Sequence, residues 1–572
     1  MIARADALAA FASDHFDLAV IGGGITGAGV ALDAASRGYS VALVERDDYA
    51  SGTSSRSSKL VHGGLRYLQN FDLGLVREAL LERSLMVELA PHLVRPLPML
   101  VPAFGGKRPD RLMGVGLNMY DVMASDRLRR RPGRRQRQSE DVESWSPDRH
   151  RMIDADEARE LLPALASREP TAAYLFYDCQ ADDARLVLTV LGEAERFGAV
   201  CANACQVTEL LEDEGRAAGV RFRDAIGGAE LEVRADNVVN ATGVWADRIK
   251  PEELYAEEEV PRIRPSRGTH ITLSSEDLRV EAGAIVPAGS SRTIFVLPWL
   301  GRTLVGTTDN DYEGDLDHVP PASEDIEYLL DACNRFFGTS LGENDLTGAY
   351  AGVRPLISTG DPRKSVDISR KAELYETSSG LVTITGGKLT TWRRMARMAV
   401  DRVVEREARE APCRTHEIPL GMPIEPGELP DVAGVDEESR VLLAARYGYA
   451  AREVLELAAE VPELARRIVP ELPDLVVECA FAARKEQARS IADVLLRRTR
   501  LGLLDGRGLC APDAEGPTAV ARAMGGELGW DERRERAELE AWSEVARAEG
   551  LVPGAVEPAA ETASGERAGR IA

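Results

Sequence analysis

The sequence has little of what a membrane-spanning or secreted protein needs. It holds no run of about 18 apolar residues, the length of a transmembrane helix, so no such helix is predicted. The N-terminal stretch MIARADALAAFASDHF carries Asp6 and Asp14 and lacks a long apolar core, which argues against a signal peptide. We therefore expect a protein without a transmembrane segment, and peripheral contact with a membrane stays open.

Cysteine is scarce and scattered. The chain has 7 cysteines, an odd number, and Cys201 and Cys205 lie close together in the sequence. No second pair and no histidine cluster completes a metal site beside them. The pattern predicts a reduced, cytoplasmic protein that has no metal and no disulfide framework.

Positive charge is in deficit. The 70 Lys and Arg residues stand against 94 Asp and Glu residues, which leaves a net charge of -24 and argues against nucleic acid as a partner. One stretch, DRLRRRPGRRQRQ at 126–138, is densely basic and is interrupted by Pro132 and Gly133, which predicts an exposed loop. The Arg127–Arg137 cluster is either a solvated loop that balances nearby acids or a surface that attracts anionic lipid head groups.

A length of 572 residues predicts two or three domains. Residues 17–45 have the pattern of a strand, a helix and a second strand, whereas residues 260–310 hold short β-rich runs typical of an antiparallel sheet. After about residue 411, Ala/Leu/Arg/Glu-rich segments predict several helices. Further predicted elements are helices at 71–89 and 323–337 and a strand at 381–385 that leads into a long helix.

A glycine-rich motif follows the first strand. Gly22-Gly23-Gly24-Ile25-Thr26-Gly27 fits GxGxxG and opens a helix, and Glu45 closes the next strand about 20 residues further on. Gly22 permits a tight turn, Gly24 admits a pyrophosphate to the backbone, and Gly27 lets helix and strand pack closely. Glu45 is suited to accept hydrogen bonds from ribose hydroxyls. The alternative, a glycine-rich turn without a ligand, accounts for neither the strand, the helix nor the acid.

A late strand ends in Asn240-Ala241-Thr242-Gly243 and can return to the same nucleotide. Such a strand is usual in flavoproteins, and the dinucleotide motif occurs once, at the start of the chain. These features favour FAD over NAD as the cofactor.

Ordered motifs along the chain resemble the FAD-dependent glycerol-3-phosphate dehydrogenases. The resemblance runs from about Phe16 to Trp392 and more loosely through the C-terminal helices. It rests on TSSRSSKLVHGGLRYLQ (53–69), YDCQADDARLVL (177–188), NATGVWAD (240–247), RGTHI (267–271), FVLPW (295–299), VGTTDNDYEGD (305–315), YAGVRPL (350–356), ITGGKLTTWR (384–393) and DVLLRRTRLGL (493–503).

The resemblance implies an α/β fold with a glutathione-reductase-like FAD-binding domain of Rossmann type, an antiparallel β substrate domain and a C-terminal all-α cap domain. The expected boundaries are 1–75, 172–250 and 345–405 for the FAD-binding domain, 76–171 and 251–344 for the substrate domain, 406–550 for the helical domain, and 551–572 for a disordered tail.

The motifs also predict which residues hold non-covalently bound FAD. Glycines and backbone of the first turn would meet the pyrophosphate, and the later motifs would line the flavin. The expected residues are Gly22, Gly24, Ile25, Thr26, Gly27, Glu45, Arg46, Thr53, Ser54, Ser58, Lys59, Leu60, His62, Val207, Ala241, Thr242, Gly243, Gly387, Lys388, Leu389 and Thr390.

The resemblance implies oxidation of sn-glycerol 3-phosphate to dihydroxyacetone phosphate by hydride transfer to flavin N5. That reaction needs cations for the phosphate and a base for the hydroxyl proton. Arg354, whose planar fork suits a phosphate, is the first choice of cation. His270 corresponds to the family's active-site histidine and is the expected base, since a reference pKa near 6.5 lets it accept the alcohol proton at neutral pH. The alternative is a buried histidine that only hydrogen-bonds its neighbours. The catalytic residues expected are His270, Arg354 and Lys388, and the substrate-binding residues are Arg66, Tyr67, His270, Arg354, Arg370 and Lys388.

One position departs from the family pattern. Ser266-Arg267 stands where many relatives have a lysine, which keeps the positive charge but changes its reach and leaves the role of Arg267 open.

The electron acceptor and the partners follow from the resemblance alone. It implies a membrane quinone as acceptor and a peripheral location on the inner face of the cell membrane; a glycerophosphate oxidase that uses oxygen is the alternative. An amine or amino-acid oxidase would need a carboxylate clamp and an apolar pocket, and a non-catalytic flavin-binding scaffold would not need the cations. The C-terminal helices show no catalytic constellation, so a cap, a homo-oligomer contact or a partner-subunit contact stay open.

Overall fold

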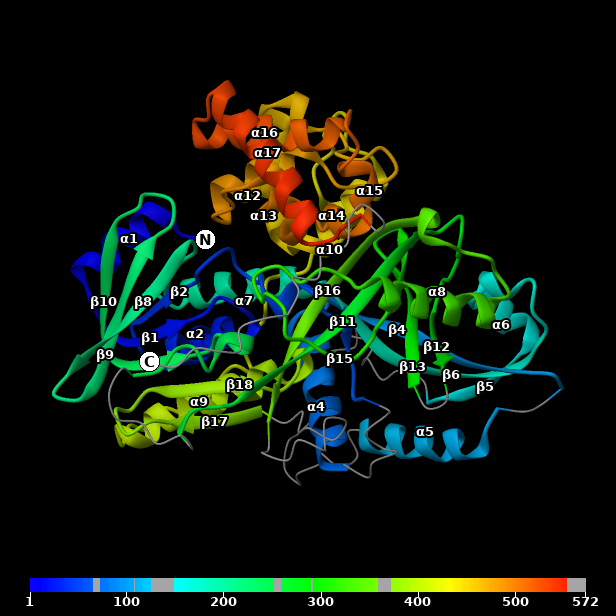
Figure 1. Ribbon diagram of the computed structural model, residues 1–572, viewed down its shortest axis with the longest axis horizontal. Helices are drawn as coiled ribbons and strands as arrows, with labels where there is room; N and C mark the ends of the chain where they lie inside the picture. The colour runs from blue at the N-terminus through cyan, green and yellow to red at the C-terminus, as the bar shows by residue number, and fades with distance from the viewer. Residues whose placement is uncertain are drawn as a thin grey trace, which may run out of the picture.

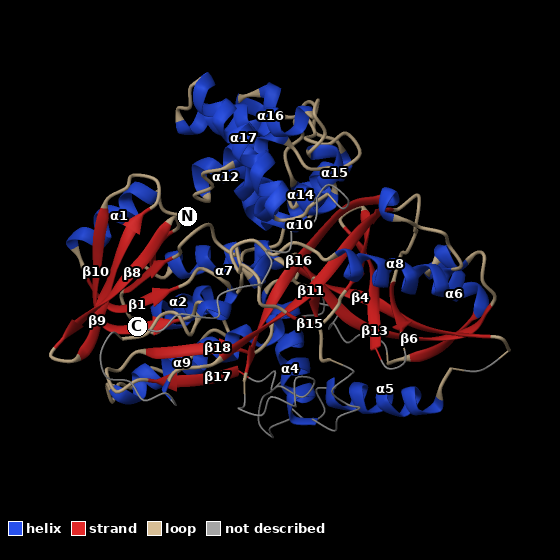
Figure 2. Cartoon of the chain, viewed as in Figure 1, coloured by secondary structure: helices blue, strands red, loops and turns tan. Residues whose placement is uncertain are grey.

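The computed structural model describes residues 1–64, 73–106, 109–124, 149–251, 259–289, 292–358 and 372–552. Within these ranges the chain forms two sheets side by side and a helical region above them (Figure 1). Figure 2 shows that this upper region contains helices and loops, whereas strands dominate the two lower parts.

The first sheet, of eight strands among the described residues, carries the dinucleotide motif. Its central order is β17 (Ala372–Glu376), β18 (Val382–Gly386), β10 (Glu230–Asn240), β1 (His15–Ile21), β2 (Val41–Val44) and β7 (Val200–Ala202). The pairs β18–β10, β10–β1, β1–β2 and β2–β7 are parallel, and every residue of β2 is buried, as expected for a parallel sheet that is covered on both faces. β8 (Cys205–Asp213) and β9 (Arg216–Asp224) extend it as an antiparallel ribbon from β10.

Three helices pack in one layer on this sheet. α2 (Ile25–Ser36) contacts both α7 (Asp183–Arg196) and α9 (Trp392–Arg406). α2 follows the glycine turn directly and is buried along almost its whole length. A helix with small residues on its surface permits this close approach, and the indole of Trp392 covers Gly29.

The second sheet is mostly antiparallel. Ten strands among the described residues form it, in the order β15 (Asn310–Asp311), β11 (Ile263–Ser274), β14 (Arg302–Gly306), β13 (Arg292–Trp299), β12 (Gly283–Ala288), β4 (Val94–Phe104), β6 (Pro170–Ala181) and β3 (Leu60–Val61), with β5 (Arg151–Asp154) on β6 and β16 (Leu346–Ile357) on β11. β11 and β16 pair over nearly their full length, with His270 opposite Tyr350 and Ser266 opposite Arg354. α8 (Ser323–Phe337) covers one face.

Two helices lie below the sheets in Figure 1, on the side away from the helical region. They are α4 (Leu73–Leu89) and α5 (Arg111–Ala124), which pack on each other.

The C-terminal region is helical from α10 (Glu437–Tyr447) to α17 (Glu532–Ala548). Its other helices include α11 (Ala451–Glu460), α12 (Val476–Lys485), α13 (Ile491–Asp493), α14 (Leu501–Leu504), α15 (Gly506–Leu509) and α16 (Glu515–Leu528). Its apolar core is continuous with Leu60, Trp299 and Tyr350 of the second sheet. The helical region therefore shares a core with the rest of the chain.

The structure reproduces most predicted elements. The strand–helix–strand unit, the antiparallel strands after residue 260 and the helix at 323–337 all form, and the predicted strand at 381–385 is β18. α9 begins at Trp392, because Leu389–Thr391 forms a separate 3₁₀ turn, η7. The domain boundaries stay a prediction, but β6 and β16 pair in the second sheet although most of β6 and all of β16 fall in segments expected for the FAD-binding domain. Nearly all of the predicted disordered tail lies outside the described residues.

The packing of α2 against α9 predicts opposite effects for one substitution at two glycines. A β-carbon at Gly29 would lie 2.7 Å from the ring of Trp392 and 3.1 Å from Ala396, so Gly29→Ala should destabilise the fold by about 1–3 kcal/mol through overpacking. Gly192 in α7 has open space around its α-carbon, so Gly192→Ala should stabilise it by about 0.5–1 kcal/mol. Thermal unfolding of both variants measures this; a Gly29→Ala protein as stable as the wild type would contradict the packing argument.

Candidate functional site

A cavity of about 460 Å³ opens at the carboxyl ends of β1, β2, β10 and β18. This edge of a parallel sheet is where ligands of such folds bind. Glu45 and Arg46 line it after β2, and Gly387 and Lys388 line it after β18, the two outermost of these four strands. The predicted cofactor residues that line it are Gly22, Gly24, Ile25, Thr26, Glu45, Arg46, Thr53, Ser54, Val207, Ala241, Thr242, Gly243, Gly387, Lys388 and Leu389.

The glycine turn has the shape that a pyrophosphate needs. Gly22 has φ of +108°, and a β-carbon at Gly27 would collide with the carbonyl oxygen of Gly22. Gly27 therefore does not line the cavity but brings α2 onto β1. Gly24 is the N-cap of α2 and supplies no side-chain cap, and it lines the cavity together with Ile25 and Thr26 of the first helical turn. These features fit a dinucleotide phosphate group.

Glu45 holds the turn as well as lining the cavity. Its carboxylate accepts hydrogen bonds from the backbone N–H groups of Gly23, at 2.6 Å, and Asp47, at 2.9 Å. Burial raises the pKa of Glu45 to about 7, although these two donors oppose the shift. The acid thus has a fixed position where a ribose would lie, and its charge depends on pH near neutrality.

The opposite end of the cavity is built by β18 and the turn after it. Gly387 has φ of +67°, and a β-carbon there would collide with the sulfur of Met395. Lys388 follows as the N-cap residue of η7, and it lines the cavity. Thr390 exchanges hydrogen bonds with the backbone of His62, at 3.2 and 3.3 Å, so the loop at His62 is tied to this turn without lining the cavity itself.

The segment Thr53–Leu60 enters the cavity only in part. Thr53 and Ser54 line it, and the Ser54 hydroxyl accepts the N–H of Ile25 at 3.0 Å. Lys59 is fully buried, with its ammonium 2.9 Å from both carboxylate oxygens of Asp183. Ser58 and Leu60 also lie outside the cavity lining.

His270 lies in the middle of β11 and is 2% exposed. Its ring stacks on Tyr350 with centroids 4.8 Å apart, and its Nε2 hydrogen-bonds the Ser58 hydroxyl at 2.8 Å. Burial, followed by the charges of Lys59 and Arg354, holds the pKa of His270 well below its ordinary value. The imidazole is therefore neutral at neutral pH, which is the form that can accept a proton.

Arg354 reaches across from β16 to the same face of β11. Its guanidinium donates to the Asp309 carboxylate at 3.2 Å and to the Thr308 carbonyl at 3.1 Å. A β-carbon at Gly268 would lie 2.6 Å from an Arg354 nitrogen, so the guanidinium lies over Gly268. Since Gly268 and His270 are two residues apart on one strand, the cation and the imidazole share a face, about 7 Å apart along the strand.

Arg267 lies on the other face of β11. Its guanidinium is 3.4 Å from Asp325 of α8 and lies over the ring of Tyr312. Thr269, which shares that face, donates to the same Asp325 at 2.6 Å. The departure from the family pattern thus places a structural cation away from His270.

Three predicted substrate residues, Arg66, Tyr67 and Arg370, lie outside the described residues, as does the Arg127–Arg137 cluster. The structure adds residues that the sequence did not single out. Asp309 and Thr308 position Arg354, and Asp183 and Tyr350 support the surroundings of His270. Asp309 and Asp183 stand inside quoted motifs, but their spacing carries no signal of a contact with residues far away in the chain.

Comparisons with known proteins agree with this geometry. Residues 17–402 match the family described as FAD dependent oxidoreductase, and residues 382–535 match the C-terminal domain of alpha-glycerophosphate oxidase. The chain is 37% identical over 538 residues to glycerol-3-phosphate dehydrogenase 2 of Mycobacterium tuberculosis, covering 92% of this chain and 87% of that protein. It is 36% identical over 557 residues to mitochondrial glycerol-3-phosphate dehydrogenase of Mus musculus, covering 92% and 72%.

A solved structure extends the comparison to the whole fold. The glycerol-3-phosphate dehydrogenase of Bacillus halodurans complexed with FAD has a TM-score of 0.73 at 28% identity, covering 97% of this chain and 99% of that one. The predicted fold class is confirmed.

The buried acid in the cavity predicts that FAD binding depends on pH. We expect ribose hydroxyls of FAD to donate to the ionised carboxylate, so binding should favour ionised Glu45, whose pKa burial raises to about 7. Affinity for FAD should therefore fall as pH is lowered from about 8 to about 6, by up to about tenfold per unit below the pKa. Titration of apoprotein with FAD, followed by flavin fluorescence, measures this. Glu45→Gln should remove the dependence, and an equal slope in that variant would show that Glu45 is not the titrating group.

Proposed function

We propose that this chain, which belongs to the FAD-dependent glycerol-3-phosphate dehydrogenases, passes the electrons of its substrate to a quinone at a membrane surface. It is an FAD-dependent oxidoreductase that oxidises glycerol 3-phosphate. The roles of individual residues, the acceptor and the membrane contact are the proposed part.

One observation carries the assignment of residues. The guanidinium of Arg354 lies over Gly268, on the face of β11 that carries His270. Gly268 and His270 are about 7 Å apart along the strand, and both Arg354 and His270 belong to motifs of the family. A short phosphate ester can place its phosphate at the guanidinium and its secondary hydroxyl toward the imidazole. An amino-acid substrate would instead need a carboxylate clamp beside an apolar pocket.

The two residues act together on the substrate. Arg354 binds the phosphate with charge-assisted hydrogen bonds, each worth about 1.5–3 kcal/mol. The substrate dianion offsets the positive charge of Arg354, which is one of the charges that lower the pKa of His270. Substrate binding therefore makes His270 a stronger base at the moment when the hydroxyl proton must be taken.

FAD, when bound, supplies the acceptor for the hydride that leaves the secondary carbon. Lys388 lines the cavity end expected for the flavin ring and would oppose negative charge there. Arg66, Tyr67 and Arg370 complete the proposed substrate set by resemblance.

α5 supports a peripheral membrane contact. Val115, Met119 and Val122 lie on one helical face and are 57%, 37% and 61% exposed. Tyr120, on the buried side, accepts the N–H of Gly63 at 2.8 Å, next to His62. The helix thus separates an apolar surface from the loop beside the cofactor site, and we propose that it rests on the inner face of the cell membrane, where quinone resides. None of the described helices is long and apolar enough to span a bilayer.

The alternative acceptor, oxygen, is favoured by one finding, the match of residues 382–535 to the C-terminal domain of an oxidase. The two acceptors are distinguished by how fast each reoxidises the reduced protein.

Anaerobic mixing of the FAD-loaded protein with sn-glycerol 3-phosphate tests the function. The flavin absorbance should bleach rapidly and should return faster with a quinone analogue than with oxygen. In the same assay, His270→Gln should slow bleaching at saturating substrate by about 10²–10⁴-fold. Arg354→Ala should weaken substrate binding by about tenfold or more while leaving FAD bound.

Arg267→Ala is the matched control, because it removes an arginine from the opposite face of the same strand. It should bleach at nearly the wild-type rate. Wild-type bleaching by His270→Gln would remove the histidine from the mechanism, and no bleaching in the flavin-loaded wild type would mean that the substrate assignment is wrong.

The exposed face of α5 predicts a loss of vesicle binding on polar substitution. Val115→Ser combined with Val122→Ser should lower flotation with anionic lipid vesicles several-fold, because each valine would contribute apolar burial in the interface. Bleaching by substrate should be unchanged. Val441→Ser, which alters another exposed valine in the helical region, is the control. Equal flotation of all three proteins would show that α5 is not the contact.

A further inference from the structure

The motif DVLLRRTRLGL has no role in the chemistry above, yet its charges are buried. Arg497, Arg498 and Arg500 are 7%, 0% and 0% exposed. They lie in and directly after the π-helical turn Val494–Arg498 of the C-terminal region. Burying charge is costly unless each charge is paired, so the partners of these arginines show what the burial achieves.

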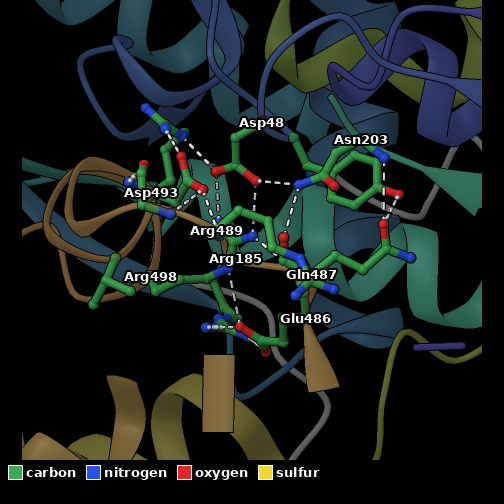
Figure 3. Close-up of polar contacts among 12 residues, drawn as sticks. Asp48, Arg185, Asn203, Glu486, Gln487, Arg489, Asp493 and Arg498 are labelled. Carbon is green, nitrogen blue, oxygen red and sulfur yellow. Dashed lines mark hydrogen bonds and ion pairs between the residues drawn. The ribbon is translucent and has the colours of Figure 1, made fainter. Parts of the chain in front are cut away.

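The first partner is Asp48, in the loop that follows β2 of the first sheet. Arg497 Nε donates to the Asp48 carboxylate at 2.6 Å, and Arg498 donates to both of its oxygens at 2.9 Å. Figure 3 shows Asp48 between Arg498 and Asn203, whose amide donates to it at 3.2 Å. Asp48 is 3% exposed. Most of the hydrogen bonds to its carboxylate come from Arg497 and Arg498, more than 400 residues away in the chain.

Asp48 lies in a segment that lines the cofactor cavity, without lining it itself. It follows Glu45, Arg46 and Asp47 and precedes Ser51, all of which line the cavity. The next residues contact the glycine turn itself, since Ala50 N–H donates to the Gly23 carbonyl at 3.1 Å. The Tyr49 ring lies against Gly23, where a β-carbon would be 2.7 Å from it.

Gln487 of the helical region makes a further contact with the segment that contains Asp48 and Tyr49. Its side-chain carbonyl accepts the Tyr49 hydroxyl at 3.1 Å, and its amide donates to the Cys201 carbonyl at 2.9 Å. Asp48 and Tyr49, which together support the glycine turn, are thus both held by residues of the C-terminal region.

Arg500 makes an equivalent contact on the other side of the site. It pairs with Asp182, and the adjacent Asp183 binds Lys59 and the Ser57 hydroxyl, the latter at 2.7 Å. Those residues belong to the segment that begins with the cavity-lining Thr53 and Ser54. Arg497 and Arg498 therefore pair with an acid inside a cofactor-binding segment, and Arg500 pairs with the acid next to Asp183, which contacts the second segment.

We propose that Arg497, Arg498 and Arg500 are positioning residues for FAD: they hold the segments at Asp48 and Asp182 in the conformation that binds the cofactor. Docking of the helical region and binding of FAD are then thermodynamically coupled, and each stabilises the other. The C-terminal region is part of the cofactor site, although none of the three arginines lines the cavity.

Asp48→Asn tests the coupling with little change in shape. The loss of charge should raise the dissociation constant for FAD by about tenfold, which corresponds to about 1.4 kcal/mol. Glu478→Gln is the control, because Glu478 is equally buried and pairs with Arg446 wholly within the helical region. It should lower thermal stability but keep FAD affinity within about twofold. Unchanged affinity in Asp48→Asn, or an equal loss in both variants, would overturn the proposal.

Hydrogen exchange on the wild-type protein tests the same coupling without a variant that must fold. Removal of FAD should raise amide exchange in residues 46–51 and 494–505 together, and added FAD should restore protection in both. Faster exchange in 46–51 with no change in 494–505 would show that the arginines only join two domains.

Discussion

The close approach of α2 to β1 is the constraint on which the cofactor site depends. Only glycine fits at position 27, because any side chain would collide with the Gly22 carbonyl. That contact aims the N-terminus of α2 at the cavity, and it sets the distance at which Glu45 can reach the Gly23 N–H. If α2 lay further from β1 by even the width of a methyl group, its N-terminal N–H groups would no longer face the phosphate position. The hydrogen bond between Glu45 and the Gly23 N–H would also be lost. Gly27 and Gly29 both allow close packing of α2: Gly27 lets the helix approach the end of β1, and Gly29 lets Trp392 pack against the helix.

The positions of His270 and Arg354 depend on the register between β11 and β16 rather than on close packing. Pairing of β11 with β16 puts Tyr350 opposite His270 and Arg354 opposite Ser266. A slip of one residue would move His270 to the face where Arg267 and Thr269 meet Asp325, and His270 would no longer share a face with Arg354. Because the strands pair over nearly their full length, this register is fixed by many backbone hydrogen bonds. The relative position of His270 and Arg354 is therefore set first by secondary structure, and contacts such as that of Arg354 with Asp309 add to it.

The sequence predicted what depends on local pattern. The strand–helix–strand unit, the glycine turn and Glu45 lie within one short segment, and their periodicity defines their structure. It predicted less well which residues line the cavity. Thr53 and Ser54 line the cavity, but Lys59 of the same motif does not. Its ammonium group pairs instead with Asp183, more than 100 residues away in the chain. Asp309, which positions Arg354, was equally invisible. Such pairings arise from tertiary packing, and a single sequence does not record them.

The same limit explains why the C-terminal helices offered no functional signal when considered alone. An arginine in a helical segment predicts a solvated surface, and that expectation holds unless an acid from elsewhere meets it. Here the acids come from two segments far away in the chain, Asp48 after β2 of the first sheet and Asp182 between β6 of the second sheet and α7. A buried ion pair adds little net stability compared with apolar packing, but it demands a particular partner at a particular place. Apolar residues at this interface would attach the helical region just as firmly while leaving the residues around Asp48 free to shift. Charged residues there fix the cofactor-binding segment as well as the contact, which accounts for their burial at a cost in desolvation.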